Sequence, residues 1–263
     1  MDPSFLSAVI AGNMDSVRRL LDEDRIRLYG MTIKGNSILH IAANLGNDWL
    51  ITEACNNSEL DLLMHQNLKG ETIIHLAARA GHDHILSLLI DHQAGRQMTG
   101  ALNRRGDSAL HEAARCGHVN AVRWLLAVGE NMASIINEYG ESPLYLAVVR
   151  GSVEIVEMLL ECAMVEYGGP RGQTALHAAV CGSYGSKPSH YFNNRFNRDG
   201  ELLLRLVAEA VTSDAPMDPL NVGEMFRGAM GYFYSRPRRQ IALHAAIRRS
   251  YDIARMLLKE NRH

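Results

Sequence analysis

The chain has 263 residues, 47% of them hydrophobic, and a formal net charge of −2. This composition can bury a sizeable core, and the balanced charge gives no overall attraction to nucleic acid or to an anionic membrane. Four separated cysteines without a CxxC pair predict small buried side chains in a reducing compartment. No run approaches the ~18 apolar residues of a membrane helix, and the N-terminus lacks a signal-peptide pattern. We therefore expect a cytoplasmic chain without direct membrane insertion. The alternatives are a nuclear location, or a location at the cytosolic face of a membrane through a partner.

The N-terminal residues are expected to form a pair of helices that no turn motif precedes. Ala8-Val-Ile-Ala-Gly12 ends a short first helix, and Val17-Arg-Arg-Leu-Leu21 belongs to a second. A terminal copy of a repeat differs from the internal copies because its outer side has no neighbour. Residues 1–33 are therefore predicted to be an N-terminal capping repeat.

From residue 34 onward one motif recurs, first as Ser37-Ile-Leu-His40-Ile-Ala-Ala43. Residues that match His40 follow at spacings of 35, 36, 34, 32 and 67 residues, at His75, His111, Tyr145, His177 and His244. Self-similarity of this period predicts helix pairs that stack on their neighbours. The repeats expected after the capping repeat span, within a single domain, residues 34–68, 69–104, 105–138, 139–170, 171–238 and 239–263.

The residues around the histidine account for the turns and helix ends of each copy. A glycine at the turn permits positive φ, and a serine or threonine two residues later can cap the first helix. A second glycine ends that helix, and a leucine-rich second helix follows, whose i, i+3, i+4 spacing buries one face. The predicted N-caps are Ser37, Thr72, Ser108, Ser142 and Thr174, and the predicted helix-ending glycines are Gly46, Gly81, Gly117 and Gly151.

This pattern resembles the ankyrin repeat, in which Gly-x-Thr-Pro-Leu-His-x-Ala-Ala and a Gly-His pair precede a leucine-rich helix. The resemblance covers essentially the whole chain. It implies an all-α ankyrin solenoid of about seven helix–turn–helix repeats with short hairpin turns. It also implies a non-catalytic module that binds a protein partner through its hairpin tips and its concave inner helices.

A narrower resemblance is carried by Met1-Asp-Pro, Leu110-His-Glu-Ala-Ala-Arg-Cys-Gly-His118, Glu141-Ser-Pro-Leu-Tyr-Leu-Ala147 and Gly169-Pro-Arg-Gly-Gln-Thr-Ala-Leu-His-Ala-Ala179. These segments look like the plant accelerated-cell-death type of ankyrin–transmembrane protein, which carries a membrane domain after its repeats. The resemblance implies a soluble adaptor or regulator in defence and stress signalling. The alternative is the cytosolic domain, or a truncated paralogue, of a membrane ankyrin relative with which it associates through the repeats.

The repeat at 171–238 departs most from the pattern, because long insertions interrupt it. They contain an aromatic cluster that includes Tyr191, Phe192 and Phe196. Such side chains favour the centres of interfaces, but they can equally fold back over a degenerate repeat. Both interpretations stay open, since long loops are either functional or disordered.

Neither a catalytic nor a metal site is predicted. Seven of the twelve histidines occupy the two histidine positions of the repeat, where a structural role is expected. His82-x-His84 lacks a third ligand at useful spacing, and no nucleophile motif or phosphate loop is present. We expect no cofactor, no metal and no enzymatic activity. The short basic run Arg236-Pro-Arg-Arg239 does not predict nucleic-acid binding.

Charge at the turns gives the candidate contacts. A basic residue precedes the turn glycine in most copies, and further arginines follow the first helix, so a basic ladder along the concave side would favour an acidic protein partner. The alternative is a solvated turn of mixed charge, in which exposed pairs contribute little. The partner-binding residues predicted from the tips, inner helices and insertion are Lys69, Glu71, Arg79, Arg105, Asp107, Glu112, Arg115, Tyr139, Glu141, Arg150, Arg171, Tyr191, Phe192 and Phe196.

Overall fold

A computed structural model of the chain describes residues 1–57, 59–172, 175 and 178. The chain divides into two compact parts, Met1–Glu166 and Tyr167–His263. Most of the second part, including the insertions expected within 171–238 and the repeat expected at 239–263, lies outside the described residues.

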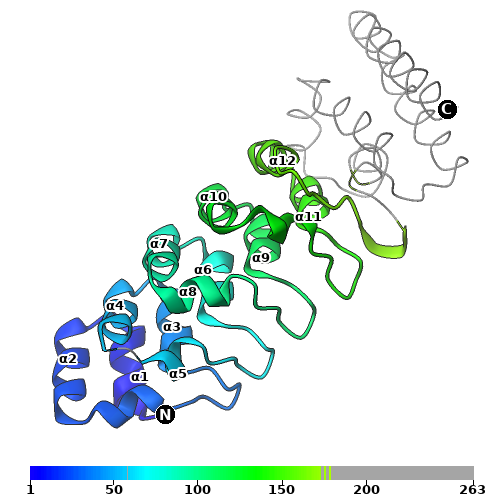
Figure 1. Ribbon diagram of the computed structural model, residues 1–263. Helices are drawn as coiled ribbons and strands as arrows, with labels where there is room; N and C mark the ends of the chain where they lie inside the picture. The colour runs from blue at the N-terminus through cyan, green and yellow to red at the C-terminus, as the bar shows by residue number, and fades with distance from the viewer. Residues whose placement is uncertain (58, 173–174, 176–177, 179–263) are drawn as a thin grey trace, which may run out of the picture. The chain divides into compact units, whose positions relative to one another are not determined.

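The first part is a stack of antiparallel helix pairs arranged in two rows, with a loop projecting from each successive pair along one edge (Figure 1). The first helices of the pairs form one row: α1 (Pro3–Ile10), α3 (Ile38–Leu45), α6 (Ile73–Ala80), α9 (Ala109–Cys116) and α11 (Pro143–Arg150). The second helices form the other: α2 (Met14–Glu23), α4 (Asp48–Asn56), α7 (Asp83–Asp91), α10 (Val119–Val128) and α12 (Val153–Leu160). The predicted helix pairs are therefore confirmed as far as residue 166.

Short helices that the sequence pattern does not predict follow four of the second helices. They are η1 (Arg25–Tyr29), α5 (Leu60–Leu63), α8 (Gln93–Met98) and η2 (Glu130–Ser134). Each bridges the distance back to the next hairpin, and buried residues such as Leu28, Leu63 and Met98 attach these segments to the core. In the second part, η3 covers Pro170–Gly172.

The ends of the first helices follow the predicted residues. Ser37, Thr72 and Ser108 form capping boxes in which the histidine three residues later replaces the usual glutamate, and Ser142 caps α11 ahead of Pro143. All four predicted helix-ending glycines adopt the left-handed conformation, at φ 77–82°. The predicted cap Thr174 lies outside the described residues.

The core lies between the two rows. The paired alanines of α6 and α9, Ala77-Ala78 and Ala113-Ala114, are fully buried, so neighbouring first helices approach closely. Leucine and isoleucine side chains of the second helices, such as Leu86, Leu89 and Leu125, fill the space behind them. An isolated bridge joins Met31 and Ser37, and the described residues contain no strand. Within that range, no helix is both long and apolar enough to cross a membrane.

Candidate functional site

A histidine in each of three first helices joins its repeat to the next one. The backbone N–H of Ser37 donates to Nδ1 of His40, so the proton lies on Nε2, which donates to the carbonyl of Glu71 at 2.9 Å. His75 contacts the carbonyl of Asp107 at 3.0 Å in the same way, and His111 that of Glu141 at 3.2 Å. We call these three contacts the histidine bridges. The structural role predicted for these histidines is confirmed.

Burial of the imidazole explains the charge state of the bridges. Loss of hydration lowers the pKa of His40 and His111 to about 4 and also lowers the pKa of His75. The rings are therefore neutral at pH 7, as their hydrogen bonds require.

The histidines that begin the second helices are structural as well. Nε2 of His118 contacts the carbonyl of Arg79 at 3.0 Å, and Nε2 of His82 contacts that of Asn44 at 3.2 Å. A Cβ on Gly81 would lie 2.5 Å from the His118 ring, so this glycine provides both the left-handed turn and the room for the next repeat. His84 contacts the carbonyl of Gly46 at 3.4 Å, so the His82-x-His84 nitrogens face backbone oxygens.

Backbone hydrogen bonds fix the hairpin tips relative to one another. The N–H of Leu68 donates to the carbonyl of Lys34 at 3.1 Å. In the next hairpins the N–H of Arg104 donates to the carbonyl of Lys69 at 2.8 Å, and the N–H of Glu138 donates to the carbonyl of Arg105 at 2.9 Å. Side chains at successive tips are therefore presented from an ordered row.

An asparagine at the base of three hairpins was not singled out from the sequence. Oδ1 of Asn67 accepts from the N–H groups of Lys69 and Glu71, at 2.9 and 3.0 Å, and Asn103 and Asn137 repeat the arrangement. These Asx turns hold the hairpin closed. The signal was present, since an asparagine recurs four residues before each acidic tip residue.

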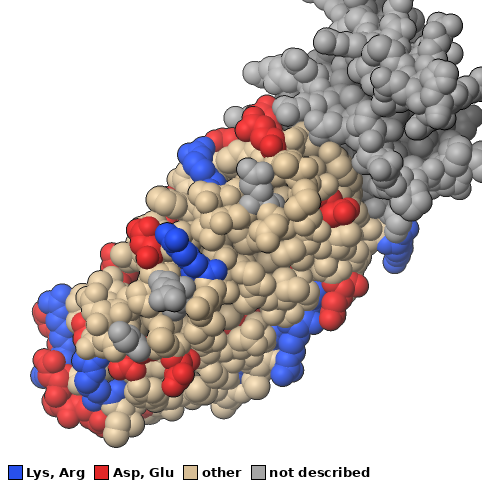
Figure 2. Space-filling view, in the orientation of Figure 1, with Lys and Arg blue, Asp and Glu red and all other residues tan. Residues whose placement is uncertain are grey.

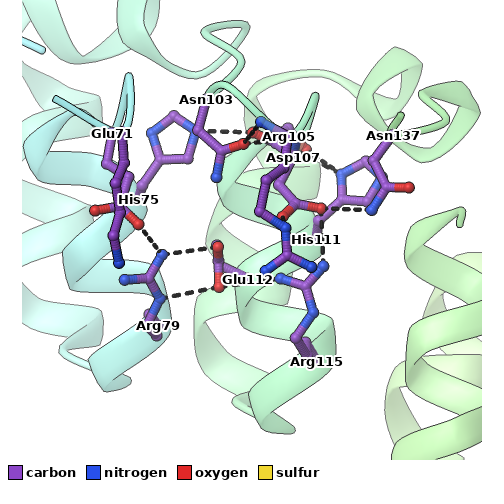
Figure 3. A network of polar contacts seen from close by, with 12 residues as sticks. Glu71, His75, Arg79, Asn103, Arg105, Asp107, His111, Glu112, Arg115 and Asn137 are labelled. Atoms are coloured by element: carbon purple, nitrogen blue, oxygen red, sulfur yellow. Dashed lines mark hydrogen bonds and ion pairs between the residues drawn. The ribbon is translucent and has the colours of Figure 1, made fainter. Parts of the chain in front are cut away.

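Between the hairpins and the inner helices lies a network of charged side chains (Figure 3), which we call the carboxylate–arginine network. Its members are Glu71, Arg79, Asp107, Glu112, Arg115 and Glu141.

Arg79 of α6 holds Glu112 of α9 through two bonds of 3.0 and 2.8 Å and also pairs with Glu71. Arg115 donates to Asp107 at 2.8 Å and approaches Glu112 at 3.2 Å. The network therefore ties neighbouring repeats together through side chains, beside the histidine bridges.

The pKa directions follow from these contacts. Burial alone would raise the pKa of Glu71, but hydrogen bonds from Asn67 and Arg79 hold it below its ordinary value. Burial would likewise raise the pKa of Asp107, but hydrogen bonds from Arg115 and Asn137 lower it. The hydrogen bond to Glu112 raises the pKa of Arg79. The carboxylates of Glu71 and Asp107 are therefore charged at neutral pH.

The burial of three predicted contact residues corrects the expectation that their side chains face a partner. Glu71, Asp107 and Glu112 are 5%, 0% and 4% exposed, because the arginines and asparagines of adjacent repeats enclose them. Their carboxylates stabilise the stack from within. Glu141 is half-buried in the same network, and Arg79 and Arg115 are partly exposed with their guanidinium groups engaged.

Other predicted contacts are exposed at the tips and helix ends. Lys69, Arg105, Tyr139 and Arg150 are exposed, and the guanidinium of Arg105 lies 4.9 Å over the Tyr139 ring. Arg171, in the second part, is exposed at φ 59°. Tyr191, Phe192 and Phe196 lie outside the described residues.

Charge on the surface is mixed and lies toward its edges. Figure 2 shows a broad uncharged face, with basic and acidic side chains around it and along the edge where the hairpins project. Because Arg79 and Arg115 are bound to carboxylates, the predicted basic ladder reduces in this part to Lys34, Lys69, Arg105 and Arg150. The exposed Arg104 adds a cation at the tips, whereas Glu138 opposes them and Arg105 lies 3.7 Å from the Asp107 carboxylate.

The chemistry available to cysteines and metal ligands is limited in the described part of the chain. Burial raises the pKa of the Cys55 and Cys116 thiols, which keeps them protonated. No group of three or more histidine, cysteine or acidic side chains is placed to hold a metal ion among these residues.

Comparison with known proteins gives one family. A family model described as ankyrin repeats (3 copies) matches residues 39–136 and 128–186. A search of curated proteins finds no match. The matched residues exceed half of the chain and contain the histidine bridges and all six residues of the carboxylate–arginine network.

Proposed function

The chain belongs to the ankyrin-repeat family, a family of protein–protein interaction modules, and from that premise we propose that it binds a protein partner on the surface formed by its hairpin tips and inner helix ends. The role is that of a non-catalytic adaptor or regulator. The observation that carries the proposal is the ordered row of tips, whose backbones are hydrogen-bonded to one another while their side chains remain exposed.

Order in the free protein matters because binding then costs little conformational entropy. The contacts assigned to the partner are the exposed residues of the first part: Lys69, Arg105, Tyr139 and Arg150. Arg171 and the aromatic residues Tyr191, Phe192 and Phe196 remain proposed contacts of the second part.

An acidic partner surface is favoured by the tip charges. Four exposed cations stand along the tips of the first part, opposed by Glu138. Attraction between exposed charges is screened by salt, so affinity should fall between about 50 and 500 mM salt. Unchanged affinity over that range would refute this aspect of the proposal.

The cellular role rests on the narrower sequence resemblance. We place the chain in plant defence or stress signalling, with a membrane ankyrin relative as a candidate partner that it regulates by association through the repeats. A cytoplasmic location, or one at the cytosolic face of a membrane, is consistent with that role.

Proximity labelling in cells tests the surface directly. The full chain is compared with a variant in which Lys69, Arg105, Tyr139 and Arg150 are replaced by alanine. Arg123→Ala, an exposed change on the outer helix α10, serves as the matched control. Partners labelled by the full chain and by the control, and lost with the tip variant, support the proposal; partners that survive the tip substitutions refute it.

A further inference from the structure

An apolar groove lies on the inner side of the first three repeats. It has a volume of about 760 Å³ and receives side chains from both the first helices and the hairpins. The apolar side chains that define it are Ile10, Ile33, Ile41, Leu45, Leu68 and Leu76.

Several of these side chains are far more exposed than large apolar residues in a core. Ile33 is 96% exposed, Ile10 59% and Leu68 57%, and Leu45 is close behind at 46%. They come from α1, α3 and two hairpins, and they line one groove. A contiguous apolar surface of this kind marks an interaction site, whereas isolated exposed leucines do not.

One edge of the apolar groove carries two exposed lysines, of which Lys69 also attracts the Glu71 carboxylate without forming an ion pair with it. Lys34 and Lys69 line it from the hairpins, both are exposed, and neither forms an ion pair with any residue described. Glu71 and Arg79 also line the groove, but they form an ion pair with each other. Glu71 also accepts a hydrogen bond from Asn67, and Arg79 also pairs with Glu112. A ligand in the groove therefore meets an apolar floor and a lysine edge.

We propose that the apolar groove binds a short segment of a partner protein that carries large apolar side chains and a flank of acidic residues facing Lys34 and Lys69. The inference rests on the proposed function, since it assigns one part of the inner surface to one chemical class of partner. Charge complementarity favours this occupant. The apolar side chains supply the affinity, and the lysines set the direction in which the segment lies.

The test is a selection of random 16-residue peptides displayed on phage against the full chain. The expected peptides combine leucine, isoleucine or phenylalanine with aspartate or glutamate. The affinity of a selected synthetic peptide is then measured by fluorescence anisotropy. Replacing Leu45 and Leu68 by serine should raise its Kd at least about tenfold. Replacing Lys34 and Lys69 by glutamate should do the same and reverse its salt dependence, because salt then screens a repulsion.

Two exposed positions away from the groove give matched controls. Ile26→Ser removes an exposed apolar side chain from η1, and Arg19→Glu reverses a charge on the outer helix α2. Both should leave Kd within about twofold, because exposed substitutions outside an interface have small effects. Circular dichroism and urea midpoints equal to those of the unchanged chain verify that every variant folds.

The outcomes separate the groove from the wider proposal. Peptides that lack acidic residues, or an empty selection, overturn the groove inference. If Arg105→Ala and Tyr139→Ala weaken binding of the selected peptides and the groove variants do not, the groove inference is overturned and the proposed function stands. If neither the tip variants nor the groove variants weaken binding, the groove inference and the proposed function are both overturned. A dimer of the chain alone that dissociates in the Leu45→Ser, Leu68→Ser variant would show that a second copy fills the groove, and would also overturn the inference.

Discussion

The apolar groove and the carboxylate–arginine network occupy equivalent positions of successive repeats, yet one is open and the other is closed. The residue after the bridging histidine is Ile41 in α3, Leu76 in α6 and Glu112 in α9. Three residues later stand Asn44, Arg79 and Arg115. The backbone is the same in each repeat, so the difference arises from the side chains, which are apolar along the groove and charged and paired in the network. The repeat of α6 contributes to both regions, because Leu76 and Arg79 line the groove while Arg79 also holds Glu112.

The largest expected effect is a loss of stability at acid pH. It is shared by both regions, because each contains histidine bridges. The folded pKa values of His40 and His111 are about 4, below the ordinary ~6.5. Their contribution is therefore complete above pH 6.5 and is lost as the pH falls to 4, by at most ~3 kcal/mol per histidine. The free energy of unfolding from urea titrations should fall by several kcal/mol over this range. Below pH 4, protonation of Glu71 and Asp107 adds a loss specific to the network.

A control for the pH dependence comes from the chain itself. The fourth copy of the motif has Tyr145 in place of the histidine, so His111→Tyr introduces a residue that does not titrate in this range. The variant should show a shallower decline between pH 6.5 and 4. An unchanged slope would mean that the bridges do not govern acid unfolding.

The second prediction concerns a substitution that places a groove-type leucine at a position of the carboxylate–arginine network. Glu112→Leu, which copies Leu76, leaves Arg79 and Arg115 without their shared carboxylate. Loss of a buried partner costs 3–5 kcal/mol, and the partial exposure of both arginines reduces this to about 2 kcal/mol. The free energy of unfolding at pH 7 measures it. Glu112→Gln, which keeps the shape and part of the hydrogen bonding, should lose less, and a Glu112→Leu variant as stable as the original would contradict a stabilising network.

The third prediction compares the hairpins of the two regions. Asn137 accepts two backbone bonds and donates to Asp107 at 2.7 Å, whereas Thr32 at the same place in the first hairpin accepts one bond, from Asn36. Asn137→Ala should cost about 1–2 kcal/mol and Thr32→Ala less than about 1 kcal/mol. Thermal or urea unfolding separates the two, and equal losses would remove this distinction between the regions.

The smallest expected effect concerns the groove itself. Ile33→Ser and Leu68→Ser replace exposed side chains, so each should change the free energy of unfolding by no more than about 0.5 kcal/mol. The same measurement on Leu39→Ser, a fully buried neighbour on α3, should show a loss of several kcal/mol. A large loss at Ile33 or Leu68 would mean that the groove side chains support the fold.

The repeat anchors are predictable from the sequence because their causes are local. A serine cap, a left-handed glycine and a leucine stripe act within a few residues, and each recurs at the repeat period. The short helices after the second helices were missed because they have no common motif. They form wherever a buried side chain such as Leu28 or Met98 attaches the returning chain to the core.

The candidate site was less predictable because its contacts cross repeats. Arg79 and Glu112 are 33 residues apart, and nothing local indicates that they pair. Glu71, Asp107 and Glu112 were therefore predicted to contact a partner, whereas the structure buries their side chains. The apolar groove was missed for the same reason, since Ile41 and Leu76 follow the motif histidine and only their neighbours decide their exposure.

Each histidine bridge ends on a main-chain oxygen, and this has a consequence for sequence change. The residues whose carbonyls accept these bonds, Glu71, Asp107 and Glu141, also send their side chains into the network. The bond is indifferent to side-chain identity, so a mutation at such a position keeps the histidine bridge while it removes a carboxylate from the network. Substitutions along this row of residues therefore separate the two kinds of contact that join one repeat to the next.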